Sequence, residues 1–416
     1  MRVYCETYGC TMNKGDSEII CGIATKCGHE VVERLDEADM VIINTCAVKG
    51  ATYRKMLRRI EELKKTGKDV LVAGCLPLVD GEAMRKLGFG GQTISCRELW
   101  KFYEIFGNGG ATFDHSAEKV EYPKLRQGKV SAIVQIAEGC NSQCTYCSVK
   151  FARGDLKSFS QEKICQEVEE AVKEGYKEIL LTAQDTAAYG RDCGGSLPEL
   201  LGKLVEIDGS FRIRVGMMNP KNVVDIAEDL LDVFSEEKIY KFLHIPVQSG
   251  SDEILKKMGR DYTANQFLDI VERFYRKFPD LYLCTDVIVG FPGEGEAEFR
   301  KTCELIEKIK PDKTNISKFS PMPKTAASKF KQVDGREIAG RSRVLSDLCR
   351  KIGLEKNRRY LGKILDGFLT EEGEKGGKIL RAMNYKPAIV EEGELGEHLH
   401  VKIVQAFPTY LMGVRS

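Results

Sequence analysis

Three cysteines lie within one short stretch of the chain, EGCNSQCTYCSVKFARG at residues 138–154. Cys140, Cys144 and Cys147 follow the apolar run SAIVQIA, so their thiols are expected in a loop directly after a strand. A structural zinc site normally takes four protein ligands, often as two pairs, and no second pair of matching spacing lies nearby. Three cysteines on one loop suit a 4Fe-4S cluster with one iron that lacks a protein ligand. The alternatives are apolar packing, or zinc binding with a distant fourth ligand.

A second set of cysteines is spread along the first hundred residues. Cys10, Cys46 and Cys75 each end or closely follow an expected strand, in RVYCETYGC, VIINTC and VLVAGC. Parallel strands bring their carboxyl ends to one edge of a sheet, so these thiols are expected to converge. This pattern predicts a second three-cysteine cluster site, again with an open iron. The alternative is that these are buried structural cysteines, as free cysteine often is.

The composition indicates a protein of a reducing compartment. The chain has 416 residues and 15 cysteines, an odd number that cannot all pair. Disulfides are therefore not expected. No apolar run approaches the ~18 residues that a membrane-spanning helix needs, and the N-terminus MRVYCETYGC lacks the pattern of a signal peptide. The sequence predicts a cytoplasmic protein without a membrane segment.

The formal net charge of +1 provides no overall attraction to nucleic acid. Any RNA partner would have to be bound by local basic clusters, and three segments are candidates: 54–65, 256–260 and 356–363. The alternative for each is the solvated face of a helix. The last residues, 358–416, hold nine Lys and Arg against eight Asp and Glu, which argues against a mainly electrostatic RNA contact there.

The order of apolar runs predicts an α/β chain that ends in an all-β unit. Residues 1–106 alternate strands and amphipathic helices, which is typical of a small parallel α/β domain. The Gly-rich segment 107–128 indicates a linker. Residues 129–355 hold six strand candidates, SAIVQIA, KEILLTA, FRIRVGM, YKFLHIP, YLCTDVIVG and KTNISKF, with helices such as 160–175 and 265–278 between them. This pattern predicts a partial or complete parallel barrel with its chemistry at the carboxyl ends of the strands.

The C-terminal segment, 356–416, changes character. Its strand candidates are YLGKILDGFLTE, KILRAMNYKPAIVEE and HLHVKIVQAF, separated by Gly-rich turns. Short strands with such turns predict a small β-barrel or sandwich.

These motifs resemble a known family. CxxxCxxC after the first strand of an α/β barrel resembles the radical S-adenosylmethionine enzymes, in which a reduced 4Fe-4S cluster cleaves S-adenosylmethionine to a deoxyadenosyl radical that removes hydrogen from an unactivated carbon. TYGCTMNKGDSE, INTCAVK and AGC resemble the N-terminal signature of the methylthiotransferases. LHIPVQSGSDEILKKMGR and TDVIVGFPGE resemble their barrel motifs, and the final β segment resembles their RNA-binding TRAM domain.

The resemblance implies cofactors and a division of labour. It implies two 4Fe-4S clusters, one on each set of three cysteines, and S-adenosylmethionine as the methyl donor and radical source. The cluster on Cys140, Cys144 and Cys147 would make the radical. The auxiliary cluster on Cys10, Cys46 and Cys75 would hold the sulfur that is methylated and inserted. The implied partners are tRNA, an electron donor such as ferredoxin or flavodoxin, and a sulfur source.

The implied substrate follows from three stretches, 129–154, 180–192 and 214–220. They look most like the archaeal and eukaryotic branch, which forms the 2-methylthio derivative of N6-threonylcarbamoyladenosine next to the tRNA anticodon. The alternatives within the family are another tRNA adenosine or an aspartate of a ribosomal protein. An alternative of another class is a non-catalytic RNA-binding iron–sulfur redox protein.

Several further residues are candidates for the barrel mouth. In the family context we expect Tyr146 against the adenine of the cofactor, and Gln184, Gln248 and Gly290 among the cofactor contacts. Asp185, Asn219 and Ser249 are expected at the same strand ends, and loop capping is the alternative for each.

The remaining candidates have simpler interpretations. His244 is expected to be a hydrogen-bonded core histidine. Arg153 could pair with a carboxylate or phosphate, or form a surface salt bridge. The nine other cysteines match no ligand position of the family, and most of them are expected to pack in the core. Cys5 is of interest because it lies close to Cys10 in sequence.

Overall fold

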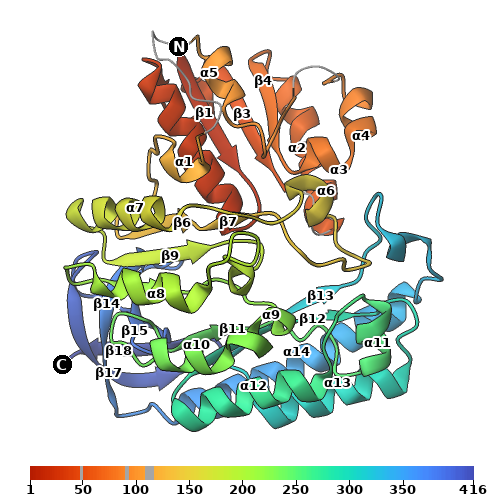
Figure 1. Ribbon diagram of the computed structural model, residues 1–416, viewed down its shortest axis with the longest axis vertical. Coiled ribbons are helices and arrows are strands. Elements are labelled where there is room, and N and C mark those ends of the chain that lie inside the picture. Colours follow the sequence, from red (N-terminus) through yellow and green to blue (C-terminus); the bar gives the residue numbers. More distant parts are fainter. Residues whose placement is uncertain (47–49, 90–92, 108–116) are drawn as a thin grey trace.

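The computed structural model describes residues 1–46, 50–89, 93–107 and 117–416. It contains an N-terminal α/β domain, a parallel α/β core and a C-terminal β-barrel (Figure 1). Residues 108–116 of the expected linker lie outside the described residues. The α/β fold class with a small all-β unit is confirmed, and the exact segment boundaries stay a prediction.

The N-terminal domain is a five-stranded parallel sheet in the order β2-β1-β3-β4-β5. Its strands are β1 (Arg2–Thr7), β2 (Glu30–Val31), β3 (Met40–Thr45), β4 (Asp69–Gly74) and β5 (Thr93–Ser95). The two edge strands, β2 and β5, are only two and three residues long, so no apolar run in the sequence predicts them.

Helices cover both faces of this sheet. One face packs against α1 (Thr11–Lys26) and α5 (Lys101–Ile105), and the other against α2 (Gly50–Lys64), α3 (Leu76–Val79) and α4 (Gly81–Lys86). Burying both faces explains why β3 is buried along its whole length and has an unbroken apolar run at 40–43 rather than an alternating pattern.

The core contains the six expected parallel strands in two sheets. One sheet has β6 (Ser131–Gln135), β9 (Glu178–Thr182) and β10 (Arg212–Arg214), and the other β11 (Phe242–His244), β12 (Tyr282–Val289) and β13 (Lys313–Lys318). A parallel bridge between Ile213 and Ile239, just before β11, joins the two sheets. No pairing joins β13 back to β6 among the described residues, so the barrel is partial.

The helices of the core pack on the outer face of these strands. They are α7 (Gln161–Lys173), α8 (Leu197–Glu206), α9 (Pro220–Val223), α10 (Ala227–Val233), α11 (Asp252–Lys257), α12 (Ala264–Lys277), α13 (Glu296–Ile309) and α14 (Gly335–Arg358). In α12, Thr263 and Gln266 form a capping box, and Phe267, Val271 and Phe274 are buried on one face. Among the described residues, none of the helices combines the length and apolar character needed to cross a bilayer.

The C-terminal unit is a closed five-stranded barrel in the order β14-β15-β16-β18-β17. Its strands are β14 (Ile364–Glu372), β15 (Lys378–Ala382), β16 (Pro387–Val390), β17 (His398–Ala406) and β18 (Leu411–Arg415). The expected strand KILRAMNYKPAIVEE is two strands, because Tyr385 has φ 63 and turns the chain between them. The last strand, β18, was not expected from the sequence.

The C-terminal barrel, which carries the chain's C-terminus, packs against the core (Figure 1). Tyr385 of the barrel contacts Tyr240 and Phe242 of the core, with ring centroids 4.9 and 4.7 Å away. Both carboxylate oxygens of Asp312, which precedes β13, pair with lysines: the buried Lys386 of the barrel and the partly buried Lys356 of α14. This end of the core is therefore covered by the barrel.

Candidate active site

Cys140, Cys144 and Cys147, the loop triad, lie between β7 (Ala137–Glu138) and α6 (Val149–Arg153), after β6. The N–H of Cys140 donates to the carbonyl of Gly154 at 3.2 Å, which closes the loop. Burial, together with the neighbouring Cys144 and Cys140 sulfurs, raises the pKa of the Cys147 thiol to about 12. The three partly buried thiols therefore lie close together on one loop, as their spacing predicts.

Cys10, Cys46 and Cys75, the sheet-edge triad, follow β1, β3 and β4, which are neighbours in the parallel sheet. Oδ1 of Asn13 lies 3.8 Å from Sγ of Cys10 and 3.7 Å from Sγ of Cys75. A Cβ atom at Gly9, which has φ +119, would lie only 3.2 Å from Sγ of Cys46. The structure thus brings the three thiols to one edge of the sheet, and metal binding by them stays a prediction.

Tyr146 and Gly290, both expected near the cofactor, belong to neighbouring segments. The Tyr146 ring meets the Phe291 ring edge to face, with 6.2 Å between centroids. Gly290 has φ 72, and a Cβ there would lie 2.3 Å from Cγ1 of Ile338. Packing against Ile338 therefore already requires glycine at this position. Close approach of a ligand to Gly290 stays a prediction.

The two candidate glutamines differ in their contacts. Oε1 of Gln184 accepts the N–H of Gly139 at 2.6 Å, so Gln184 supports the loop triad's loop. Gln248 has φ 66, and its Oε1 is buried without a hydrogen-bond partner among the described residues. Because a buried amide oxygen without a partner is costly, Gln248 is the better placed of the two to hydrogen-bond a ligand.

Asp185 and Asn219 cap turns at the barrel mouth. Oδ1 of Asp185 accepts the N–H groups of Asn219 at 2.9 Å and Ala187 at 3.2 Å, and its Oδ2 accepts Nδ2 of Asn222 at 2.7 Å. Burial raises the pKa of Asp185. Asn219 in turn donates to the hydroxyl of Ser142, inside the loop triad's loop, at 3.1 Å. Loop support, which the sequence left as the alternative, accounts for both residues.

Arg260 is a candidate functional residue that sequence reasoning missed. It belongs to the basic segment 256–260, which was expected as a possible RNA contact. In the structure its Nη1 donates to Sγ of Cys144 at 3.2 Å, and its Nε donates to the hydroxyl of Tyr262 at 3.0 Å. Nη2 is buried and lacks a partner within the described part of the chain. The guanidinium thus lies against the loop triad, and the RNA interpretation fails for this residue.

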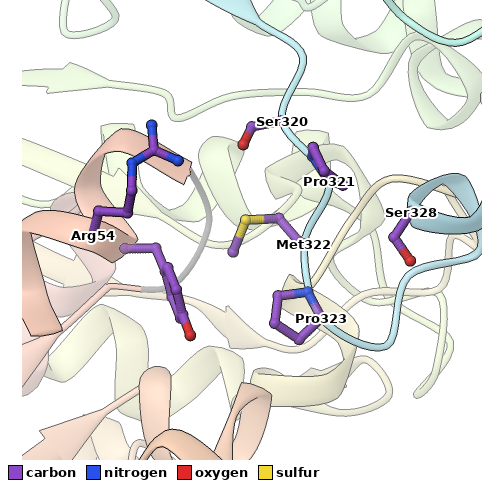
Figure 2. A pocket seen from close by; sticks show the side chains of 7 residues that line it. Arg54, Ser320, Pro321, Met322, Pro323 and Ser328 are labelled. Atoms are coloured by element: carbon purple, nitrogen blue, oxygen red, sulfur yellow. The ribbon is translucent and has the colours of Figure 1, made fainter. Parts of the chain in front are cut away.

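A cavity of about 380 Å³ opens where the N-terminal domain meets the core (Figure 2). Its lining residues come from α2 and from the segment after β13: Tyr53, Arg54, Ser320, Pro321, Met322, Pro323 and Ser328. Figure 2 shows Met322 pointing from this segment towards α2. None of the predicted ligand residues is among the side chains that line this cavity.

Comparisons with known proteins decide the family. The chain matches the radical SAM superfamily over residues 134–306, and an uncharacterized protein family, UPF0004, over residues 2–91. It is 45% identical to the probable threonylcarbamoyladenosine tRNA methylthiotransferase of Pyrococcus horikoshii over 424 residues, which covers 99% of each chain. The chain belongs to the threonylcarbamoyladenosine tRNA methylthiotransferase family. The resemblance inferred from the cysteine motifs is thereby confirmed.

This methylthiotransferase also has a relative with a different name. It is 35% identical to the tRNA-2-methylthio-N(6)-dimethylallyladenosine synthase of Pseudothermotoga lettingae over 435 residues, 99% of this chain and 98% of that one. Among solved structures it is similar to the radical S-adenosylmethionine methyltransferase TsrM from Kitasatospora setae, with a TM-score of 0.57, 14% identity and coverage of 79% and 75% of the two chains. At that identity the likeness shows the fold alone.

The donor sets of this methylthiotransferase fit iron–sulfur clusters better than single metal ions. Within the described residues, no three Cys, His, Asp or Glu side chains lie close enough to hold one metal ion. A single zinc ion draws its thiolates together around one centre. A four-iron cluster spreads them over several irons. Each triad supplies three thiolates, one fewer than a closed zinc site takes, which suits a cluster with one iron that lacks a protein ligand.

Among the other cysteines Cys193 departs from the expected core packing, because it is exposed. Cys5 lies beside Cys21, and the thiol of Cys21 lowers the pKa of Cys5 by hydrogen bonding, so Cys5 is paired within the domain core. Cys96, directly after β5, is buried in the core of the N-terminal domain and is also the neighbour of the sheet-edge triad. Its hydrogen bond to Cys75 lowers the pKa of Cys75. Position at a strand end was the signal that could have identified Cys96.

Replacing Arg260 with methionine is expected to lower the reduction potential of a 4Fe-4S cluster reconstituted on the loop triad. Hydrogen bonds to cluster sulfur favour the reduced state, and Arg260 donates one to Cys144. A redox titration followed by electron paramagnetic resonance measures the potential. The control is Lys256→Met, which removes an exposed cation of the same segment. An unchanged potential in the Arg260 variant would show that this hydrogen bond does not tune the cluster.

His244 is a hydrogen-bonded histidine, as expected. Its contacts lead us to expect that the stability of the folded protein depends on pH. Burial alone lowers the pKa of His244, but the Cys284 sulfur and the Asp286 carboxylate, 2.7 Å from Nε2, raise it to about 10. Because the folded-state pKa exceeds the ordinary value of 6.5, the stabilisation is complete below pH 6.5 and is lost as the pH rises through 10.

Denaturant unfolding of the cluster-free protein at several pH values tests this dependence. The difference in unfolding free energy between wild type and His244→Gln should shrink between pH 6.5 and pH 10. The control is His398→Gln, whose ring nitrogen lies 3.6 Å from Asp366 at a more exposed position. A difference that stays constant across this range would contradict the protonated His244.

Proposed function

We propose that this protein converts N6-threonylcarbamoyladenosine next to the tRNA anticodon to its 2-methylthio derivative. The observation that carries the proposal is the convergence of six cysteines into two triads in a chain that matches a threonylcarbamoyladenosine tRNA methylthiotransferase over its full length. The identity is higher to that relative, at 45%, than to the dimethylallyladenosine synthase, at 35%, which favours the threonylcarbamoyl substrate.

The proposed cofactors are two 4Fe-4S clusters and S-adenosylmethionine. The loop triad would hold the first cluster and the sheet-edge triad the second. With these groups bound, the protein has an electron source to cleave S-adenosylmethionine into a deoxyadenosyl radical, and a sulfur carrier for transfer to C2 of the adenine.

The side chains of this chain have separate tasks in that reaction. The open amide of Gln248 and the free Nη2 of Arg260 supply hydrogen bonds for the polar groups of S-adenosylmethionine. The Tyr146 ring supplies a flat apolar surface for its adenine. Gln184, Asp185 and Asn219 fix the loop triad's loop through Gly139 and Ser142, so that the cysteines keep one geometry during turnover.

The proposal includes partners and a location. The tRNA is the substrate, and the reaction also needs an electron donor such as ferredoxin or flavodoxin and a source of replacement sulfur. A cytoplasmic location accords with 15 free cysteines, which a reducing compartment keeps available for cluster assembly.

Nucleoside mass spectrometry tests the substrate. The reconstituted protein is incubated without oxygen with dithionite, S-adenosylmethionine and either of two tRNAs, one with threonylcarbamoyladenosine and one with dimethylallyladenosine. We expect a methylthio product from the first tRNA only. Product from the second alone would assign the other adenosine. Deoxyadenosine without tRNA product would direct attention to a ribosomal-protein aspartate, and intact S-adenosylmethionine with two redox-active clusters would favour the non-catalytic alternative.

A further inference from the structure

Arg153 connects the two triads through a largely buried network. It is the last residue of α6 and follows Cys147 closely in the chain, and only 2% of its side chain is exposed. Nη1 pairs with Oε1 of Glu138 at 2.8 Å, and Nη2 pairs with Oδ2 of Asp16 at 2.7 Å. Nη2 also donates to Oδ1 of Asn13 at 2.8 Å. Arg153 is therefore no surface ion pair, which corrects one of the two alternatives from the sequence.

One end of this network holds the loop triad. Glu138 precedes Cys140 by two residues and Arg153 follows Cys147, so their ion pair joins the two flanks of the loop. Lys119 binds the same two carboxylates as Arg153. Its Nζ contacts Oε1 of Glu138 at 2.7 Å and Oδ1 of Asp16 at 3.1 Å. Two cations and two carboxylates balance, so the buried cluster of charges is neutral and each ion is compensated.

The other end holds the sheet-edge triad. Besides its contact with Arg153, Asn13 donates from Nδ2 to the carbonyls of Tyr8 at 2.8 Å and Thr45 at 3.0 Å. Tyr8 and Thr45 precede Cys10 and Cys46, and Oδ1 of Asn13 lies near the sulfurs of Cys10 and Cys75. One amide therefore touches the segments of all three cysteines, and Arg153 fixes its orientation.

We propose that Arg153 is a positioning residue that holds the two triads, and the clusters bound to them, in one fixed arrangement. The proposal rests on the proposed function, because a radical formed at the first site and a sulfur held at the second must reach the same carbon. Reactions of this kind are sensitive to misplacement of about 1 Å, which can cost about 10²-fold in rate. A guanidinium suits the task, since its planar fork reaches Glu138, Asp16 and Asn13 together, which a lysine cannot.

The test compares Arg153→Lys with a matched control, Arg126→Lys. Arg126 is also a buried arginine, with 9% of its side chain exposed, and it pairs with Glu167 at 3.1 Å without contacting a cysteine segment. The first readout is the magnetic interaction between the two reduced clusters by electron paramagnetic resonance, without tRNA or S-adenosylmethionine. We expect this interaction to change in Arg153→Lys and to stay as in wild type in Arg126→Lys.

The second readout is the ratio of deoxyadenosine to methylthio product. It should rise by about tenfold or more in Arg153→Lys and stay unchanged in Arg126→Lys. Asn13→Ser removes the hydrogen bond to Arg153 and leaves the ion pairs of Arg153 in place. It should change both readouts in the same direction. This variant provides the test if Arg153→Lys fails to fold. Wild-type values of both readouts in the Arg153 and Asn13 variants would overturn the proposal. Absence of methylthio product in the wild type would instead overturn the proposed function, and the magnetic readout would still decide the role of Arg153.

Discussion

Replacing Cys144 with alanine is expected to abolish the formation of deoxyadenosine from S-adenosylmethionine. The substitution removes one thiol of the loop triad and also the acceptor of the hydrogen bond from Arg260. A cluster bound by three thiolates already has one iron without a protein ligand. The substitution would leave a second iron without one. Anaerobic incubation with dithionite and S-adenosylmethionine, followed by chromatography of the nucleosides, should show deoxyadenosine at the background of the cluster-free protein.

The same change in the sheet-edge triad is expected to give a different result. Cys46→Ala should still form deoxyadenosine, uncoupled from product, because the loop triad is intact. It should form no methylthio nucleoside. The control is Cys303→Ala on α13, a partly buried cysteine outside both triads, which should keep both activities. Equal loss of both activities in the Cys46 variant would argue against separate tasks for the two triads.

Replacing Asp312 with alanine is expected to destabilise the docking of the C-terminal barrel by about 3–5 kcal/mol, since it leaves the buried Lys386 and the partly buried Lys356 without this counter-charge. The Asp312 side chain is 1% exposed and pairs with both Lys386 and Lys356. Its Oδ2 also accepts the N–H of Leu283 at 3.0 Å. Denaturant unfolding measures the loss, and limited proteolysis should release the barrel, residues 364–416, faster than from wild type.

A surface pair provides the matched comparison for Asp312. Asp261 pairs with Lys221 at 2.5 Å, but 63% of its side chain is exposed. Exposed pairs contribute about 0–1 kcal/mol, so Asp261→Ala should have a small effect. If the two alanine variants lose the same stability, the two lysines do not depend on Asp312 and the interpretation of the interface is wrong.

The repeated strand–helix pattern made the fold and the positions of both triads predictable. Cys46 and Cys75 directly follow apolar strands, and parallel strands share one carboxyl edge, so their convergence required only the order of the strands. The convergence of the loop triad could be predicted without the order of the strands, because its members are neighbours in sequence. Strands β2 and β5 were missed because two or three residues carry no readable periodicity.

The residues that surround the cysteines could not be predicted in this way. Arg260 meets Cys144 across 116 positions of the chain, and Arg153 meets Asn13 across 140. The first contact joins distant segments of the core, and the second joins the core to the N-terminal domain, so neither leaves a local pattern in the sequence. Charge was also misleading: Arg260 lies in a basic segment, and Lys119 lies in the expected linker, yet both side chains turn inward to sulfur or carboxylate partners.

The most direct test of the central claim follows the hydrogen atom at C2 of the substrate adenine. A tRNA that carries deuterium at C2 of its threonylcarbamoyladenosine is converted without oxygen, and deoxyadenosine and the tRNA nucleosides are analysed by mass spectrometry. We predict one deuterium in deoxyadenosine for each 2-methylthio product. Methylthio product accompanied by deoxyadenosine without deuterium would contradict radical removal of hydrogen from C2.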